Sequence, residues 1–506
     1  MIQRFCRLTF LTAVLTGVFS CTNLDPKVYD QIENFWNTPE QVAAGVAPAY
    51  SGLRGLPSGA IFNLNEVTSD EVVVPTRGSD WYDNGAWQQL WQHGWDPNHG
   101  DISSAWTFIY TGVANINRIL QTVGALEPAP SDLAGIQAEL KTIRAFYYFQ
   151  ALDLFGNVPV VENYEVDLTT VTNKPRAEVF AFVENELKTN LPNLRDAVDG
   201  STYGKVTQWF SQALLAKLYL NAQVYTGTPK WAECIAACDA IINSGKYSIQ
   251  PNFFDNFKVN NESSVENIFV IPFDATKGLG GLNTQMQTLH YQSNETFGLA
   301  ATPWNGFCTV ADFYNQFDPV DKRREMFLVG QQYSRTGEPL EDLQVKLPLK
   351  FDPDVTAISS AAPSFRMAGA RSVKYQPTPN TTGDMNNDFA VFRLGDIILM
   401  KAEAELRSGT GDPVATLNYQ SSGVSIRSRA GLPDFTSINL DDLLKERARE
   451  MAWEMWRRND LIRFGKYLAA RVPEKAVSQS FRTLFPIPKA ELDRNSNLTQ
   501  NDGYPQ

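Results

Sequence analysis

Histidine and cysteine are scarce in this sequence. The 506 residues include three histidines and five cysteines, which leaves little for metal sites built from imidazole or thiolate. Cys234 and Cys238 are four residues apart in a helical pattern, where two thiols point in parallel directions and form a disulfide poorly. Cys308 has no evident partner. We therefore expect buried free thiols, no metal and no cofactor.

Basic residues are also fewer than acidic residues. The chain has 44 Lys and Arg residues against 56 Asp and Glu residues, a net charge of −12, and its pI is near 5.0. This balance argues against a nucleic-acid partner, because phosphate backbones are bound by basic surfaces. Hydrophobic residues make up 43% of the chain and charged residues only 20%, which is typical of a folded protein.

Long hydrophobic runs are missing after the first twenty residues. The apolar run over residues 8–19 follows two arginines and is too short for a bilayer, which needs about 20 residues, but it fits a secretory signal. Ser20 followed by Cys21 is typical of a bacterial lipobox. We expect residues 1–20 to be removed and Cys21 to be lipidated, which anchors the protein to a membrane. An ordinary secretory signal with a cysteine nearby is the alternative.

Helical periodicity extends over much of the chain. Residues 38–41 have the form of a capping box, and apolar residues spaced by three and four predict helices over 101–120 and 131–155. Two helical hairpins are predicted as well. One joins 207–225 to 231–244, and the other joins 391–407 to a second arm that follows Pro413 and runs to Arg429.

The predicted fold is a single all-α domain over residues 21–506. Hairpins of this length, with small residues where two helices approach, resemble tetratricopeptide units, whose repeat is about 34 residues. The segments of about 55–100 and 250–390 lack periodicity and are rich in Gly, Pro, Asn, Asp and aromatic residues. We interpret them as loop-rich insertions that carry the function.

Catalytic signatures are missing. The sequence has no phosphate-binding P-loop, no G-x-S-x-G and no H-E-x-x-H. Glu446, Glu450 and Glu454 are one helical turn apart and are the best candidates for a glycosidase acid and base. Several arginines surround them, and Glu454 and Arg458 have the spacing of a favourable helical ion pair. We interpret the cluster as charge compensation and expect no enzyme.

Five of the eleven tryptophans fall between Trp81 and Trp106. Three of these five, at positions 87, 91 and 95, have the spacing of a buried helical stripe. Trp81 and Tyr82 instead lie in a polar loop with no apolar period, where a ring can stack on a sugar while neighbouring polar groups bind its hydroxyls. The alternative is a ring that packs the loop onto the helices.

A second segment, residues 302–309, also combines a ring with an amide in a turn-rich sequence. Weaker candidates follow in a third irregular stretch. The full set of candidate ligand-binding residues is Asp70, Arg77, Asp80, Trp81, Tyr82, Trp304, Asn305, Cys308, Arg371 and Tyr375.

Several motifs in order along the chain resemble the SusD/RagB family of Bacteroidetes lipoproteins. They are the lipobox with Leu24-Asp25-Pro26, Ile143-Arg144-Ala145-Phe146-Tyr147-Tyr148-Phe149, Leu154-Phe155-Gly156-Asn157-Val158-Pro159, Glu446-Arg447-Ala448-Arg449-Glu450, Asp460-Leu461-Ile462-Arg463-Phe464-Gly465 and Leu484-Phe485-Pro486-Ile487-Pro488. The resemblance implies a glycan-binding protein, lipid-anchored at the outer membrane and exposed at the cell surface. It also implies a tetratricopeptide-like scaffold that closes over a SusC-like TonB-dependent transporter.

The expected function is therefore non-catalytic capture of an oligosaccharide or polysaccharide for import. Capture of a peptide or another nutrient by the same lid mechanism is an alternative within the family, and a glycan hydrolase is an alternative outside it. The hydrolase predicts a paired acid and base, whereas capture predicts rings and amides on loops.

Overall fold

The computed structural model describes residue 36 and residues 38–505, and the chain divides into two units, one ending at Gly45 and one beginning at Val46. The lipobox and Cys21 lie outside the described residues. Helix α2 (Pro39–Ser51) opens with the predicted capping box, because the Thr38 amide donates to Gln41 Oε1 (3.1 Å) and the Gln41 amide donates to Thr38 Oγ1 (3.3 Å). Among the described helices, none is long and apolar enough to span a bilayer.

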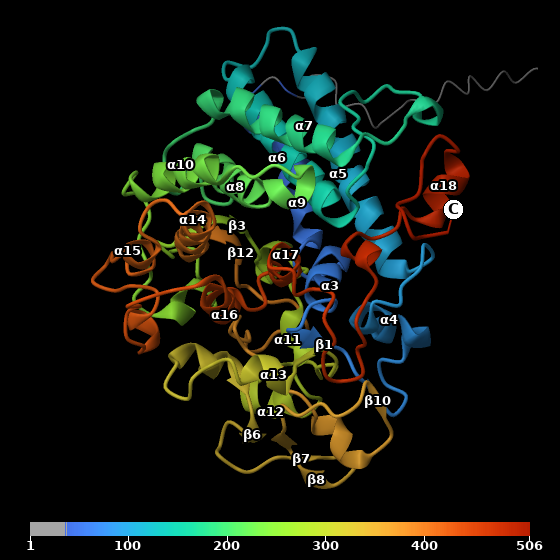
Figure 1. The fold of residues 1–506 in the computed structure, drawn as a ribbon, viewed down its shortest axis with the longest axis vertical. Helices are drawn as coiled ribbons and strands as arrows, with labels where there is room; N and C mark the ends of the chain where they lie inside the picture. The colour runs from blue at the N-terminus through green and yellow to red at the C-terminus, as the bar shows by residue number, and fades with distance from the viewer. Residues whose placement is uncertain (1–35, 37, 506) are drawn as a thin grey trace, which may run out of the picture. The chain divides into compact units, whose positions relative to one another are not determined.

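The unit that begins at Val46 is built mainly of α-helices (Figure 1). The helices are α3 (Ala60–Glu66), α4 (Ala86–Gln92), α5 (Gly100–Gly124), α6 (Leu133–Leu154), α7 (Arg176–Asn190), α8 (Gln208–Leu220), α9 (Ala222–Thr226), α10 (Trp231–Ile242), α11 (Thr284–Thr288), α12 (Ser293–Phe297), α13 (Ala311–Tyr314), α14 (Leu394–Ser408), α15 (Pro413–Leu417), α16 (Leu440–Met451), α17 (Arg457–Arg463) and α18 (Lys489–Arg494).

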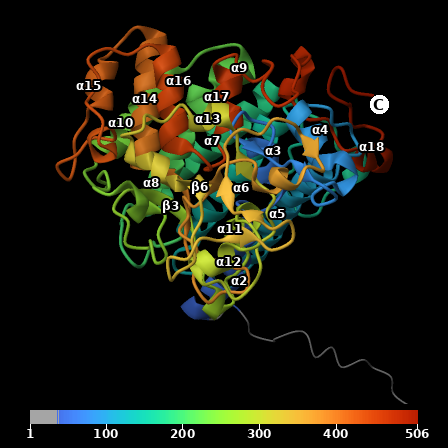
Figure 2. The same cartoon turned by 90° about the horizontal axis from the view of Figure 1, so that it is seen from below.

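The long helices pack in neighbouring pairs, α5 on α6, α6 on α7, α8 on α10 and α10 on α14. Helix α6 is central, and every residue from Thr142 to Leu154 is buried. Helix α5 approaches it closely at Gly112, where a Cβ atom would come within 2.2 Å of the Tyr147 ring. In both views α10, α14 and α15 lie on one side and α4 and α18 on the other (Figure 1 and Figure 2). The sequence predicted α5, α6 and the α8–α10 hairpin correctly.

The second predicted hairpin is wrong in its second arm. Helix α14 forms as expected, but only α15 follows it, and the chain from Asn418 to Asn439 is irregular apart from one short 3₁₀ turn. Ser422 and Gly423 both have positive φ, at 51° and 78°, and form a tight turn that a helix does not contain. The predicted tryptophan stripe is also shorter than expected, because α4 ends at Gln92, before the buried Trp95.

The all-α prediction is only partly correct, because the helix-rich fold also contains short strands. The described residues contain six two-stranded sheets, which pair β1 with β4, β2 with β10, β5 with β11, β3 with β12, β6 with β9 and β7 with β8. The strands are β1 (Val72–Val73), β2 (Thr76–Arg77), β3 (Asn267–Ile271), β4 (Cys308–Thr309), β5 (Phe327–Leu328), β6 (Gly330–Gln331), β7 (Glu341–Asp342), β8 (Leu347–Pro348), β9 (Lys350–Phe351), β10 (Ser359–Ser360), β11 (Arg371–Ser372) and β12 (Phe389–Arg393).

Most of these strands lie in the two segments that the sequence marks as irregular. Two pairings join the segments to each other: β1 is antiparallel to β4, and β2 is parallel to β10. The loop that follows β2 and the loop that precedes β4 are thereby held side by side. These two loops carry Trp81, Tyr82 and Trp304, the aromatic residues of the two loops that were predicted to bind a ligand.

Candidate functional site

The loop after β2 has an unusual backbone. Arg77 and Asp80 exchange backbone hydrogen bonds of 3.0 and 3.2 Å around Gly78, whose φ is 69°. Trp81, Asp83 and Asn84 then adopt φ values of 60°, 40° and 54°, in the left-handed region that costs a residue with a side chain about 1–3 kcal/mol. Such conformations concentrate at ligand sites, where the surrounding structure holds them in place.

Trp81 links the two loops. Its Nε1 donates to the carbonyl oxygen of Trp304 at 2.7 Å, and its ring packs edge-on against Phe307 and Trp87 at 5.7 and 5.6 Å. The ring lies against Gly306, where a Cβ atom would come within 2.4 Å of it. Trp81 is therefore partly a packing residue, as the alternative interpretation of the sequence held, although part of it is exposed.

Two further rings are more exposed. Tyr82 is 54% and Trp304 is 42% exposed. Together with Trp81 they form what we call the aromatic surface, which consists of Trp81, Tyr82 and Trp304. Aromatic side chains that remain exposed on two neighbouring loops are typical of a ligand-binding surface.

Polar groups border the aromatic surface. Asp80 accepts a hydrogen bond from the Tyr291 hydroxyl, and the Arg366 guanidinium lies 3.8 Å from the Asp80 carboxylate and 4.7 Å from the Tyr291 ring centroid. Burial, followed by the bond to Asp80, raises the pKa of Tyr291 to about 12, so its hydroxyl remains a donor at neutral pH. Tyr291 and Arg366 were not among the predicted site residues, because no sequence motif marks either of them.

Arg77 supports the loops from below. It is 2% exposed, and its guanidinium donates to the carbonyl oxygens of Asn305 (2.9 Å), Gly306 (2.8 Å) and Ala368 (2.9 Å). The expectation was that Arg77 contacts a ligand, whereas in this structure its donors point into the protein. Its role is to position the backbone of the second loop.

Arg371, Asn305 and Cys308 are buried beside Arg77. Arg371 donates to Asn305 Oδ1 (2.8 Å) and to the Ala368 carbonyl (2.7 Å), and Asn305 has a φ of 55°. Burial, followed by the nearby charge of Arg77, lowers the pKa of Arg371 to about 9. All three side chains are 0% exposed, so they support the site and do not form its surface.

Tyr375 and Asp70 lie elsewhere. Tyr375 is 4% exposed and stacks on Phe389 with a centroid distance of 5.3 Å. Asp70 forms a bidentate ion pair with Arg457, at 2.7 and 2.8 Å, in a separate cavity of about 530 Å³ that Trp91 also lines. Of the ten candidates, Asp80, Trp81, Tyr82 and Trp304 are those that lie at least partly exposed on the two loops joined by the Trp81–Trp304 hydrogen bond.

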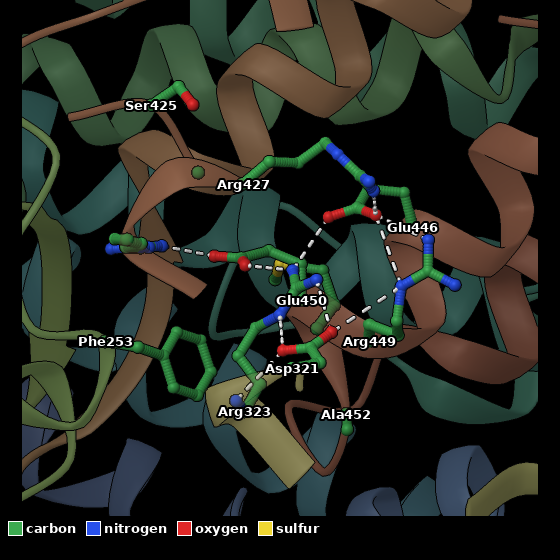
Figure 3. A network of polar contacts seen from close by, with 12 residues as sticks. Phe253, Asp321, Arg323, Ser425, Arg427, Glu446, Arg449, Glu450 and Ala452 are labelled. Carbon is green, nitrogen blue, oxygen red and sulfur yellow. Dashed lines mark hydrogen bonds and ion pairs between the residues drawn. The ribbon is translucent and has the colours of Figure 1, made fainter. Parts of the chain in front are cut away.

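The glutamates that resembled a catalytic pair are buried in an ion network (Figure 3). Glu446 binds Arg323, Arg427 and Arg449 at 2.8, 3.0 and 2.5 Å. Burial alone raises the pKa of a carboxyl, but Arg323 and Arg449 outweigh it and lower the pKa of Glu446 to about 2. The interpretation of the cluster as charge compensation is confirmed for Glu446. A carboxylate that stays ionised is unsuited to act as a general acid.

Glu450 is the centre of the same network. Its carboxylate binds Arg323 at 2.8 Å and Arg393 at 2.5 Å, and it also accepts a hydrogen bond from Arg429. These charges outweigh burial and hold its pKa well below the usual range. Breaking such a buried network by removing one partner typically costs about 3–5 kcal/mol, because the remaining charges lose their compensation.

The predicted Glu454–Arg458 pair does not form. Helix α16 ends at Met451, so the two residues are not on one helix, and Glu454 instead binds Lys374 and Arg393 at 2.5 and 2.8 Å. Arg458 binds Asp153 at 2.7 Å. The break between α16 and α17 therefore overrides the helical spacing.

Two buried carboxyls stabilise that break. Trp453 and Met455 have φ values of 60° and 68°, and their amides donate to Glu71 and Glu66, the latter at 2.5 Å. Both carboxyls are 0% exposed, and burial raises the pKa of Glu66 to about 8. No motif marks either glutamate in the sequence, because Glu66 ends α3 and Glu71 lies in the bend before β1, and both meet their partners only in the folded chain.

The cysteines are as predicted. Cys234, Cys238 and Cys308 are buried and free. Burial, followed by the neighbouring Cys234, raises the pKa of the Cys238 thiol well above its usual value, which keeps it protonated and unreactive.

Comparison with known proteins identifies the family. Residues 223–504 match the family model described as "SusD family", and residues 24–220 match a model described as "Starch-binding associating with outer membrane". The chain belongs to the SusD family. SusD family members are binding proteins rather than enzymes, and the second description places that group at the outer membrane.

Several SusD-family relatives extend over most of the chain. The "Starch-binding protein SusD" of Bacteroides thetaiotaomicron is 25% identical over 88% of this chain and 85% of its own length. A "SusD-like protein" of Bacteroides ovatus is 25% identical over 90% and 82%.

Solved SusD-like structures have the same fold. A "Laminarin binding SusD-like protein" superposes with a TM-score of 0.74 at 23% identity, over 92% of this chain and 99% of that one. "Surface glycan-binding protein A from Bacteroides thetaiotaomicron in complex with laminarihexaose" has a TM-score of 0.70 at 21% identity, over the same shares. At these identities the similarity establishes the fold.

Proposed function

We propose that this protein binds an oligosaccharide or polysaccharide at the outer-membrane surface and does not cleave it. The observation that carries the proposal is the aromatic surface, where Trp81, Tyr82 and Trp304 are held on two loops whose backbones are fixed from below. Names of relatives that bind starch and laminarin support the same chemistry.

A pyranose ring suits this surface for a physical reason. One face of the sugar is covered by C–H groups and stacks on an aromatic ring, while its hydroxyls need donors and acceptors at the edge. Asp80 supplies an acceptor and Arg366 supplies donors beside the rings. The ligand contacts are therefore proposed to be Asp80, Trp81, Tyr82 and Trp304, with Arg366 added.

We propose that the bound glycan is delivered to a SusC-like TonB-dependent transporter, and that Cys21 carries the lipid that holds the protein at the cell surface. Capture outside a membrane serves nutrition only when it is coupled to passage through that membrane. The helices from α5 to α14 would then act as a tetratricopeptide-like scaffold that supports the loops and meets the transporter.

One experiment tests binding and catalysis together. The purified full-length protein is incubated with a panel that includes laminarihexaose, maltohexaose, a cello-oligosaccharide and a peptide mixture, and both binding and product formation are measured. We expect saturable binding of at least one oligosaccharide with no shortened product. Release of shorter sugars would contradict the non-catalytic proposal, and binding of peptides alone would contradict the proposed ligand class.

A further inference from the structure

A second cavity follows helix α5, away from the loops that carry the aromatic surface. We call it the α5 groove. It has a volume of about 450 Å³, within the range of about 300–1,000 Å³ that is typical of small-ligand sites. Its floor is one face of α5, one wall is the loop between α6 and α7, and the other wall is α18. The lining residues that matter here are Trp106, Tyr110, Asn115, Arg118, Tyr164 and Glu491.

The floor of the groove carries two fixed rings. Trp106 and Tyr110 lie one turn apart on α5, with ring centroids 4.6 Å apart and an interplanar angle of 35°. The Tyr110 hydroxyl donates to the Pro159 carbonyl at 2.8 Å, and the Trp106 ring packs edge-on against Phe155 at 5.1 Å. Both rings are therefore held in place before any ligand arrives.

The wall formed by the loop presents a third ring, that of Tyr164, which is 50% exposed. The backbone on its N-terminal side is fixed by buried groups. Asn117 donates to the Val161 carbonyl at 2.9 Å, and Arg144 donates to the Glu162 carbonyl at 2.8 Å. Tyr164 therefore presents an exposed aromatic ring on the wall of the groove, beside the rings of its floor.

Arg144 is the buried anchor of this wall. It is 3% exposed and forms a bidentate pair with Glu186, at 2.9 and 2.8 Å, while it also donates to Asn117 Oδ1 at 2.7 Å. On the C-terminal side of Tyr164, Gln121 donates to Glu165 at 3.1 Å. The motif that contains Arg144 marks the family in the sequence, and here it fixes the loop over the groove.

Hydrogen-bonding groups occupy both sides of the rings. Arg118 donates to Asn115 Oδ1 at 2.9 Å on α5, and Arg494 forms an ion pair with Glu491 at 2.6 Å on α18. An amide, a carboxylate and two guanidinium groups thus line the groove together with the half-exposed ring of Tyr164, the partly exposed ring of Tyr110 and the largely buried ring of Trp106. This combination suits an uncharged ligand with ring-shaped C–H faces and many hydroxyls.

We infer that the α5 groove is a second oligosaccharide site, separate from the aromatic surface. The inference rests on the proposed function, because it takes the ligand class from there. The two sites share no residue: the first is built from the loops beside β2 and β4, and the second from α5, the α6–α7 loop and α18. Two sites on one chain raise the avidity for a long glycan that spans both.

The test compares four forms of the full-length protein by titration calorimetry with laminarihexaose and maltohexaose. They are the wild type, Tyr164→Ala in the groove, Trp304→Ala on the aromatic surface and Tyr333→Ala as a control. Tyr333 is also 50% exposed but belongs to neither site. Thermal unfolding of each form checks that the fold is kept, which we expect because both tyrosines are half exposed.

We expect two binding sites in the wild type and in Tyr333→Ala. Tyr164→Ala should weaken one of them about tenfold and leave the other unchanged, whereas Trp304→Ala should affect only the other one. A wild type with a single site that Trp304→Ala weakens and Tyr164→Ala does not would overturn the second site and leave the proposed function standing. A protein that binds neither sugar, nor any other glycan of the panel, would contradict both.

Discussion

At the scale of single residues, the three rings of the aromatic surface differ in how far they are exposed. Trp304 is the simplest to test, because its side chain is 42% exposed while its carbonyl, which Trp81 binds, belongs to the backbone. Trp304→Ala should reduce the free energy of oligosaccharide binding by about 1–3 kcal/mol, the usual value of one stacked ring, and leave the melting temperature unchanged. Calorimetry and thermal unfolding measure the two quantities. A variant that melts early would show that Trp304 is a packing residue.

Arg371 should affect binding without touching the ligand. Its guanidinium holds Asn305 Oδ1 inside the protein and shares the Ala368 carbonyl with Arg77, so Arg371→Met removes the arginine donor from the buried Asn305 Oδ1. We expect a loss of about 1–3 kcal/mol in the free energy of unfolding, measured in urea, together with weaker oligosaccharide binding. Trp304→Ala is the matched comparison, since it should change binding alone. If Arg371→Met loses affinity at full stability, Arg371 contacts the ligand directly.

Only part of the site could be predicted from the sequence, because an irregular segment does not show which of its side chains are buried. A polar loop without apolar period correctly indicated an exposed Tyr82. Arg77, Asn305 and Arg371 occur in similar segments, but nothing in an irregular segment tells a polar side chain that points inward from one that points outward. Arg366 was missed because it meets Asp80 only after nearly 300 residues of intervening chain have folded.

At the scale of secondary-structure elements, the break between α16 and α17 depends on two buried carboxyls. Its amides bind Glu66 and Glu71, and burial raises the pKa of Glu66 from an ordinary 4.5 to about 8. Between these two pH values the folded protein holds a proton that the unfolded chain has lost. The stability that Glu66 contributes is therefore fully present below about pH 4.5 and is lost as the pH rises through about 8.

Glu66→Gln should reduce this pH dependence, because the amide does not ionise and its oxygen still accepts from Met455. We expect the free energy of unfolding to fall less steeply from pH 5 to pH 8.5 than in the wild type. Urea unfolding at four pH values in that range gives the slope. Glu338→Gln, at an exposed carboxyl, is the control and should keep the wild-type slope. Equal slopes in all three proteins would contradict the role assigned to Glu66.

Helices with long apolar periods were predicted well, and short elements were not. Helix α5 and the α8–α10 hairpin follow the periodicity of their own residues. The second arm after α14 failed because Ser422 and Gly423 form a turn inside an apparently helical stretch, and α16 ends where Trp453 and Met455 take positive φ values. In both places local chemistry and long-range partners outweigh a period that is only two or three turns long.

At the scale of the whole molecule, the lipobox predicts attachment to a membrane. Cys21→Ala should prevent lipidation and move the protein from the membrane fraction to the soluble one. The comparison is made by fractionation and immunoblotting in cells that lack the proposed transporter, so that a protein partner does not hold the variant at the membrane. A variant that stays in the membrane fraction there would contradict lipid anchoring.

The support beneath the aromatic surface has a consequence for how this protein changes over evolutionary time. Arg77 binds main-chain carbonyls, which every amino acid provides, and Arg371 shares the Ala368 carbonyl and adds that of Gly369. Substitutions at Tyr82 or Trp304 therefore leave those hydrogen bonds intact. A lineage that meets a new polysaccharide is free to replace the exposed rings one at a time, and each intermediate still folds.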